Sequence, residues 1–369
     1  MGMILLSLLF LGMPCSLYSK SFLESTHGDK KKLPKGCWSC HRGHGVYNTP
    51  MLSEEKAFFC FNCHGNDLTF EQTQRAGRLA RDSRKINLSR EFEKPYRHPI
   101  EKTRIYRWNK SQYEADASAP RYAECTDCHH HHFATAQNRL EGIKGITQNG
   151  TIVDTVQSEY ELCFKCHAYS TNLPADQVNK AELFSVANPS YHPVVSQGKN
   201  NTVPSLILPY TESSIIKCTD CHNNDDAVGP KGPHASNYQH ILKKNFTTSD
   251  SMESAFQYDL CYSCHMRSSV LGNISFRYHN LHIVTVGASC RTCHNPHGSR
   301  LYPHLIDFDN VNIAPSSSGR LIYKDLGERA GECFLNCHGK DHNPATYPLN
   351  TPANTTEGTS SSSLKRIRK

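Results

Sequence analysis

The feature that most constrains this chain is a short cysteine and histidine motif that recurs eight times. Seven copies read Cys-x-x-Cys-His and the eighth reads Cys-x-x-x-Cys-His. Each is the attachment signature of c-type haem, in which two thiols add to the haem vinyl groups and the next histidine binds iron. The cysteine pairs are Cys37 and Cys40, Cys60 and Cys63, Cys125 and Cys128, Cys163 and Cys166, Cys218 and Cys221, Cys261 and Cys264, Cys290 and Cys293, and Cys333 and Cys337.

Closely spaced cysteine pairs also occur in zinc ribbons and in redox dithiols. Neither class requires a histidine directly after every second cysteine, whereas haem attachment does. We therefore expect an octahaem cytochrome c whose cofactor is eight covalently bound haem c groups with their iron. The motif histidines, expected as the first axial ligands, are His41, His64, His129, His167, His222, His265, His294 and His338.

The second axial ligand of each iron is also expected to be histidine. The chain has 22 histidines, and beyond residue 21 the methionines are limited to Met51, Met252 and Met266. A histidine precedes each odd-numbered motif, and another follows it. These eight candidates are His27, His44, His98, His132, His192, His234, His282 and His297.

The repeat leaves two of these positions open, because His279 can replace His282 and His240 can replace His234. His130, His131, His304 and His342 are expected to be ordinary surface or core residues. A histidine three residues after a motif histidine cannot reach the opposite face of the same haem. We therefore expect His44, His132 and His297 to serve a neighbouring haem.

Composition predicts a fold dominated by its cofactors. Hydrophobic residues make up 37% of the chain, below the usual ~45–50%, and only about 43 residues are available for each haem. The chain also has 19 Pro and 22 Gly, which interrupt regular structure. We expect a mostly irregular multihaem cytochrome c fold with short α-helices and few β-strands, built on a chain of stacked haems. Helices are expected at 71–84, 158–168 and 252–264, and strands at 204–210 and 213–217.

The formal charge of +7 does not indicate nucleic-acid binding, because it omits the haems. With ionised propionates, eight bis-histidine haems lower it to about −1 when oxidised and about −9 when reduced. Many Lys and Arg side chains are then expected to face propionates, since a paired charge is less costly than an isolated one.

The chain divides into three expected parts. Residues 1–21 resemble a signal peptide with an apolar run at 3–12, and Cys15 leaves a lipoprotein as the alternative. Residues 22–350 form the octahaem domain, with haem-pair repeats at 22–90, 91–185, 186–275 and 276–350. Residues 351–369 form a disordered, basic Ser/Thr-rich tail. No other segment approaches the ~20 apolar residues of a membrane span. The signal-peptide segment predicts an exported protein, which agrees with haem attachment, since c-type haem is normally attached outside the cytoplasm.

This pattern resembles the doubled CXXCH family of multihaem cytochromes over about residues 27–342. The resemblance is closest in Tyr278-His279-Asn280-Leu281-His282, followed by the motif at 290–294 and His297. The chain departs from the family in the long loop before His234 and in the extra residue of the eighth motif. The family includes soluble electron carriers and extracellular cytochrome filaments. The resemblance therefore implies copies of the chain itself, other multihaem cytochromes or extracellular electron acceptors as partners.

The expected function is long-range electron transfer through eight bis-histidine haems, without catalytic residues, in a subunit of an extracellular filament at or beyond the cell surface. A monomeric periplasmic or porin-associated carrier is the alternative. A third reading is an octahaem oxidoreductase acting on nitrogen or sulfur compounds. Such an enzyme needs an open iron, and the unusual eighth motif is the candidate for it. Seven Asn-x-Ser/Thr sequons also allow glycosylation.

Overall fold

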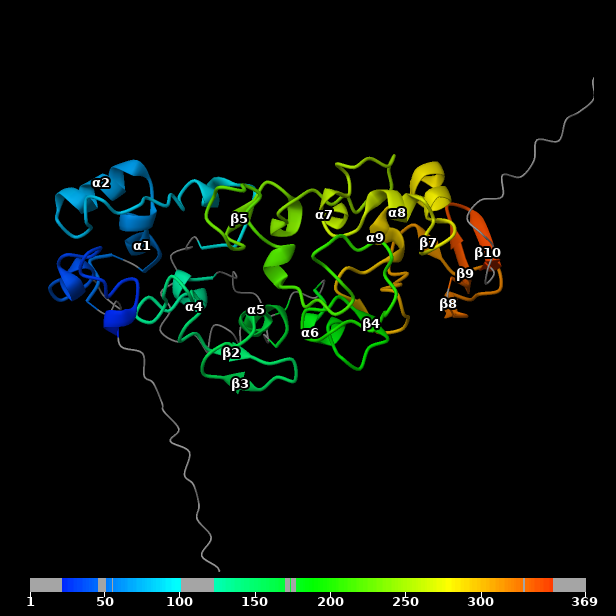
Figure 1. The fold of residues 1–369 in the computed structure, drawn as a ribbon, viewed down its shortest axis with the longest axis horizontal. Helices are drawn as coiled ribbons and strands as arrows, with labels where there is room; N and C mark the ends of the chain where they lie inside the picture. The colour runs from blue at the N-terminus through cyan, green and yellow to red at the C-terminus, as the bar shows by residue number, and fades with distance from the viewer. Residues whose placement is uncertain are drawn as a thin grey trace, which may run out of the picture.

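The computed structural model describes residues 22–45, 51–54, 56–100, 123–169, 173, 177–327 and 329–347. The expected signal peptide, Cys15 and the expected tail lie outside these residues. The described chain is elongated, and it runs from α1 and α2 at one end to β8, β9 and β10 at the other (Figure 1). No helix among the described residues has the length and apolar character that crossing a membrane requires.

The structure is mostly irregular, with short helices and small strands, as the composition predicts. The helical elements are η1 Phe22–Glu24, η2 Gly36–Ser39, α1 Lys56–His64, α2 Asp67–Arg75, η3 Glu91–Glu93, α4 Cys125–Cys128, α5 Glu159–His167, α6 Lys180–Leu183, η4 Cys218–Asp220, η5 Gln239–Ile241, α7 Asp259–Tyr262, α8 Arg267–Leu271, the π-helical η6 Leu281–Val286 and α9 Cys290–Cys293.

The strands form three two-stranded sheets and one sheet of four strands. The small sheets pair β1 with β5, β2 with β3 and β4 with β6, and in the larger one β9 pairs with β7, β8 and β10. The strands are β1 Tyr96–Arg97, β2 Gly145–Ile146, β3 Ile152–Val153, β4 Ser190–Tyr191, β5 Ala235–Ser236, β6 Gly298–Ser299, β7 Ile313–Ala314, β8 Ile322–Asp325, β9 Gly331–Cys337 and β10 Lys340–Tyr347.

Several expected elements are shorter than predicted. The helix expected at 71–84 ends at Arg75 because Gly77 adopts φ +65°. The N–H groups of Gly77 and Arg78 then donate to the carbonyls of Gln74 and Thr73, which is the pattern of a Schellman stop. Of 252–264 only α7 is helical, because the Gln257 side chain bonds to residues 251 and 252 and holds a loop.

The strands expected at 204–210 and 213–217 are absent from the described structure, so that prediction is wrong. Pro204 and Pro209 lack an N–H group, and a sheet ladder needs that donor at regular intervals. The segment instead wraps the sixth motif, where Ile207 N–H donates to the carbonyl of Cys264.

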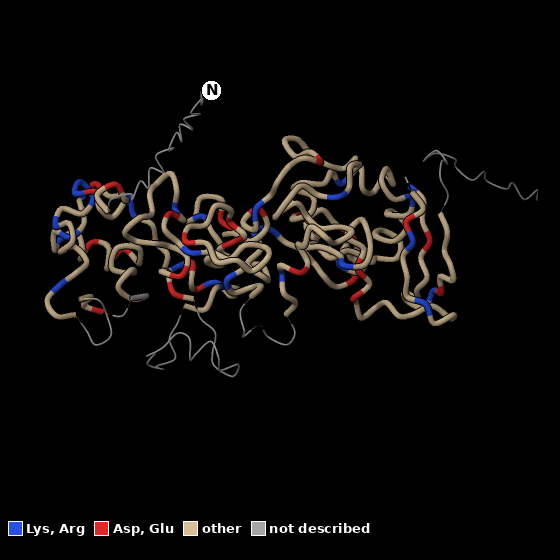
Figure 2. Tube along the Cα trace, turned by 90° about the horizontal axis from the view of Figure 1, so that it is seen from below, with Lys and Arg blue, Asp and Glu red and all other residues tan. Residues whose placement is uncertain are grey.

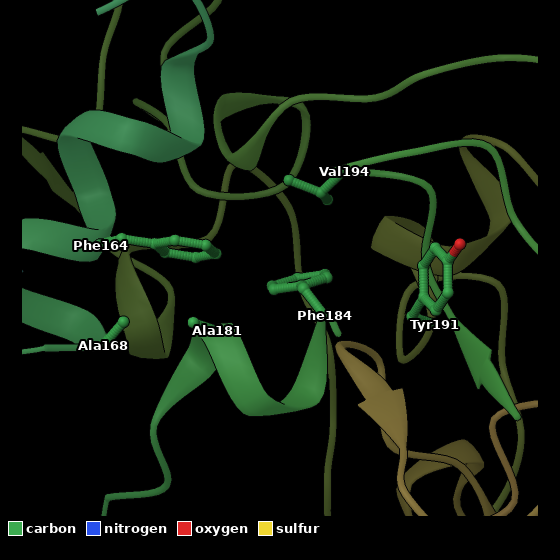
Figure 3. Close-up of a cluster of buried hydrophobic side chains, with 6 residues drawn as sticks. All are labelled: Phe164, Ala168, Ala181, Phe184, Tyr191 and Val194. Carbon is green, nitrogen blue, oxygen red and sulfur yellow. The ribbon is translucent and has the colours of Figure 1, made fainter. Parts of the chain in front are cut away.

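Apolar cores are small and separate. One consists of Phe164, Ala168, Ala181, Phe184, Tyr191 and Val194, contributed by α5, α6, β4 and the residues beside them. The Phe164 and Phe184 rings stack 6.4 Å apart between centroids (Figure 3). A second core joins Phe308, Tyr323, Leu335 and Tyr347, and a third joins Leu33, Phe70 and Leu79. Clusters of this size leave much of the stabilisation to the groups that the motifs bind.

A buried charge network ties distant parts of the chain together. Lys94 Nζ lies 2.6 Å from Glu91 and 2.9 Å from Asp225, and the three side chains are only 7–14% exposed. Burial alone would lower the pKa of Lys94, but hydrogen bonds to both carboxylates raise it above its ordinary value. Elsewhere, charges of both signs are spread along the molecule (Figure 2).

Replacing Lys94 with Met is expected to lower the free energy of unfolding by about 3–5 kcal/mol, because two carboxylates are left buried without a cation. Urea unfolding of the haem-loaded protein measures this. The control is Arg75→Met, which breaks an exposed pair with Glu71 and should cost less than about 1 kcal/mol. Equal losses in the two variants would contradict this account.

Candidate haem-binding sites

Seven of the eight motifs lie on or begin in a short helical turn. These turns are η2, α1, α4, α5, η4, α7 and α9. In five of them the N–H of the motif histidine donates to the carbonyl of the first cysteine at 2.8–2.9 Å, and the other two lie within α1 and α5. The turn brings the histidine back beside both thiols, which is the arrangement that haem attachment requires. The eighth motif instead lies on the strand β9 and the turn after it.

Histidine rings face one another in pairs across the molecule. Seven pairs have centroids 6.1–6.4 Å apart, namely His27 with His64, His41 with His132, His98 with His167, His129 with His234, His222 with His297, His279 with His294 and His282 with His342. His265 of the sixth motif has no histidine ring at this printed spacing among the described residues, but it lies near His192 and His294. Burial, and then the neighbouring His192, lower the pKa of His265 to about 4.

This spacing provides a test of whether the residues fit an iron ligated on both faces. Two imidazoles that bind one metal from opposite sides, with metal–nitrogen distances of about 2.0–2.1 Å, hold their centroids about 6.3 Å apart. The observed 6.1–6.4 Å matches this separation. These pairs could therefore hold the two axial positions of haem iron, while the adjacent motif cysteines could bind the macrocycle.

The second histidines come in adjacent couples that backbone pairing holds together. His98 N–H donates to the carbonyl of His234 next to the β1–β5 pair, and His192 N–H donates to that of His297 next to β4–β6. His27 lies beside His132 in the same way, because the N–H of residue 26 bonds to the carbonyl of residue 134. We call each couple, His27/His132, His98/His234 and His192/His297, a histidine clamp.

Each clamp serves two consecutive motifs. In the first, His132 faces His41 of motif one and His27 faces His64 of motif two. In the second, the two rings face the histidines of motifs three and four. In the third, His297 faces the histidine of motif five, and His192 lies near that of motif six. His132 and His297 thus face motifs other than the ones they follow, as the three-residue spacing requires. A clamp therefore couples two neighbouring sites through one piece of backbone.

Close approach of the strands depends on glycine at the third clamp. A Cβ atom on Gly298, directly after His297, would lie 2.0 Å from the carbonyl oxygen of Leu183 at the end of α6. Phe184 follows, and its ring meets that of His297 edge to face at 5.5 Å between centroids. The core in Figure 3 therefore supports the clamp directly.

Within each clamp the ring of the leading histidine is oriented by its Nδ1 atom. Nδ1 of His27 lies 2.9 Å from the carbonyl oxygen of residue 131, and that of His98 lies 2.6 Å from the oxygen of Pro233. His192 makes the equivalent contact with Pro296. A donor bond from Nδ1 fixes the tautomer whose Nε2 is free to bind metal, as is usual for histidine ligands.

Two motif histidines are oriented in the same way, through a contact between Nδ1 and a backbone carbonyl. Nδ1 of His222 contacts the carbonyl of His240 at 2.8 Å, and that of His294 contacts the carbonyl of His304 at 3.0 Å. Both acceptor residues have positive φ. His240 and His304 therefore contribute backbone oxygens to these contacts.

Burial favours the uncharged form of several paired rings. Burial first, and then neighbouring histidines, lower the pKa of His64, His167 and His234 to about 4. For His279 the same causes lower the pKa to about 3. Neutral imidazole is the form that binds metal, so the sites are prepared for ligation at neutral pH.

The cysteines show how the motifs are ordered in space. The first thiols of motifs two and three, four and five, and six and seven share hydrogen bonds, which raise the pKa of Cys60, Cys163 and Cys290. Burial and, among other neighbours, the thiols of the adjoining motif raise the pKa of the second cysteines Cys40, Cys128, Cys221 and Cys293. Each motif thus lies near the motifs before and after it, which places the eight candidate sites in one row in sequence order. In Figure 1 the elements that carry the row, from α1 to β9, follow the long axis.

His44 and His342 lie elsewhere than the sequence pattern predicts, and His279 takes a position that the pattern had left open between it and His282. His44 is exposed, and within the described residues the ring facing His41 is His132. His279 faces motif seven at His294, whereas His282 faces His342. The last repeat therefore uses both histidines of its Tyr-His-Asn-Leu-His segment. Two histidines three residues apart ahead of one motif are the signal that could have identified both ligands.

Replacing His297 with Ala is expected to leave the fifth haem with His222 alone, because no other ring faces that histidine at this spacing among the described residues. Electron paramagnetic resonance of the oxidised protein should then show one high-spin haem per chain. His240→Ala is the control, since it preserves the backbone oxygen that orients His222. An unchanged spectrum for His297→Ala, or the same change in the control, would refute the assignment.

Comparison with known families gives two matches. A family described as "Doubled CXXCH motif" matches residues 31–69 and 119–171, which hold the first four motifs. A family described as "Cytochrome c554 and c-prime" matches residues 217–295, which hold motifs five to seven. No significant match to a curated protein or a solved structure was found. Together with the motif turns, these matches support a multihaem c-type cytochrome with covalently bound haem c, whose domains imply electron transfer.

Proposed function

We propose that this protein conducts electrons along a row of eight c-type haems, each held between two histidines. The observation that carries the proposal is the spacing of the ring pairs, 6.1–6.4 Å between centroids, repeated from His27 to His342. Bound haem supplies the redox-active iron. The chain supplies axial ligands, orients them and keeps consecutive sites in contact through the clamps.

Saturated ligation favours an electron conductor over an enzyme. When histidine occupies both axial positions, a small substrate has no free position on the iron, and the ligands and their surroundings set the reduction potential. An octahaem oxidoreductase acting on nitrogen or sulfur compounds needs at least one open iron. Every one of the first seven motif histidines has a second ring opposite it or, for His265, nearby.

Mass spectrometry of the intact protein is expected to show eight haems per chain. Electron paramagnetic resonance should show only low-spin ferric signals, and carbon monoxide should leave the reduced spectrum unchanged, because both axial positions are occupied. A stoichiometric high-spin haem in the unmodified protein would overturn the proposal and favour the oxidoreductase. Turnover with nitrite, hydroxylamine or tetrathionate would then be the next measurement.

We further propose that copies of the chain assemble end to end into an extracellular filament, with other multihaem cytochromes or extracellular acceptors as redox partners. The row of sites runs along the long axis, and the first and last motifs lie in the segments that form the two ends (Figure 1). His27 and His342, the terminal histidines, both face rings within the chain. Exposed His44 follows the first motif, where a neighbouring copy of the chain could contact it.

Negative-stain images of the concentrated protein are expected to show filaments. His44→Ala should shorten or abolish them without changing the low-spin spectrum, because His44 faces no motif histidine of its own chain in the described structure. His304→Ala, at another partly exposed histidine, serves as the control. Particles that remain monomeric at high concentration would instead support a periplasmic or porin-associated carrier.

A further inference from the structure

The eighth motif differs from the others in its backbone. Cys333 and Cys337 lie on β9, and the motif histidine His338 follows at φ +51°, with Gly339 at φ +76°. Two consecutive residues with positive φ between paired strands make a type I′ hairpin turn. His338 is therefore the first residue of the turn between β9 and β10, and no helical turn returns it to the thiols.

The hairpin register places a different histidine beside those thiols. His342 on β10 pairs directly with Leu335 on β9. Directly paired residues project to the same face of a sheet, as do alternate residues along one strand. His342 thus shares its face with Cys333, Leu335 and Cys337, which all pack into the second apolar core.

Opposite this face lies the remaining second histidine of the row. The ring of His282 is 6.3 Å from that of His342 between centroids, within the range of the other pairs. Nδ1 of His282 contacts the carbonyl of Tyr278 at 2.8 Å, so its Nε2 is the nitrogen left for metal. Phe276 stacks on His282 at 5.7 Å and meets Tyr347 edge to face at 5.0 Å. Aromatic side chains therefore surround this pair.

His338 has another role in the structure. Its Nε2, the atom that would bind iron, lies 2.8 Å from Asp250 Oδ2. The same carboxylate accepts hydrogen bonds from Ser289 N–H at 2.8 Å and from the side chain of Asn312 at 2.6 Å. Ser289 caps α9, which carries the seventh motif. His338 thus fastens the hairpin turn to the start of the seventh site.

We propose that His342, and not the motif histidine His338, is the axial ligand that faces His282 across the eighth haem. The inference rests on the proposed row of bis-histidine haems and deepens it at the last site. The eighth motif then reads as two thiols and a ligand on one face of a hairpin. The extra residue within the motif fits a strand, because it spaces the cysteines by an even number and keeps both on that face.

The test compares His342→Met with His338→Met in the full, haem-loaded chain. Methionine in place of an axial histidine raises the reduction potential of a c-type haem and gives the near-infrared charge-transfer band of methionine-ligated ferric iron. His342→Met should convert one of the eight haems in this way, as measured by spectroelectrochemistry and magnetic circular dichroism. His338→Met should leave all eight haems with the spectrum of histidine-ligated iron. Intact mass counts the haems in each preparation.

A second variant covers the case in which methionine does not reach the iron. His342→Ala should give one high-spin haem that returns to low spin when imidazole is added. His304→Ala, in the same C-terminal part of the chain, should leave every haem low-spin. Conversion by His338→Met alone, or no change in either His342 variant, would overturn the inference. These outcomes leave the first seven sites low-spin, so they differ from the unmodified high-spin haem that would refute the proposed function.

Discussion

The rest of the structure depends on the short backbone pairing that holds two histidines side by side. In the second and third clamps it involves two residues from each strand, and segments more than 100 residues apart meet there. Such a pairing is marginal by itself. It is supported by the small core around Phe184, by the close contact at Gly298 and by the charge network of Lys94. Ligation of two irons by each clamp would stabilise the same contacts further.

The row of sites follows from how the clamps overlap with the motifs. A clamp joins motifs one and two, three and four, or five and six from the side of the second ligands. Thiol contacts join motifs two and three, four and five, and six and seven from the side of the attachment turns. The two kinds of contact alternate, so every neighbouring couple from motif one to motif seven is fixed by one of them. An apolar core of ordinary size is therefore not needed to keep the sites in order.

Much of this arrangement could be predicted from the sequence, because the motif is a covalent requirement and the histidine repeat is periodic. His132 and His297 could be assigned, on geometric grounds alone, to sites other than those of the motifs they follow. The pairing of His98 with His234 could not be predicted, since two-residue strands carry no periodic signal and their partners are far apart in sequence. The strand at Cys333 could not be predicted, because the motif forms a turn in the other seven copies. The predicted strand at 204–210 failed because two prolines remove the donors it needed.

The clamps also impose an order on how the protein matures. His27, His98 and His192 each pair with a clamp histidine that is synthesised about one repeat later. The N-terminal part of a chain folds first during synthesis, so each of these pairings must wait for its second histidine. Every repeat but the last therefore stays unfinished until its successor arrives. The last repeat completes itself, because His279 and His282 lie three residues apart in one segment. The slowest contacts to close are therefore the long-range ones at the clamps.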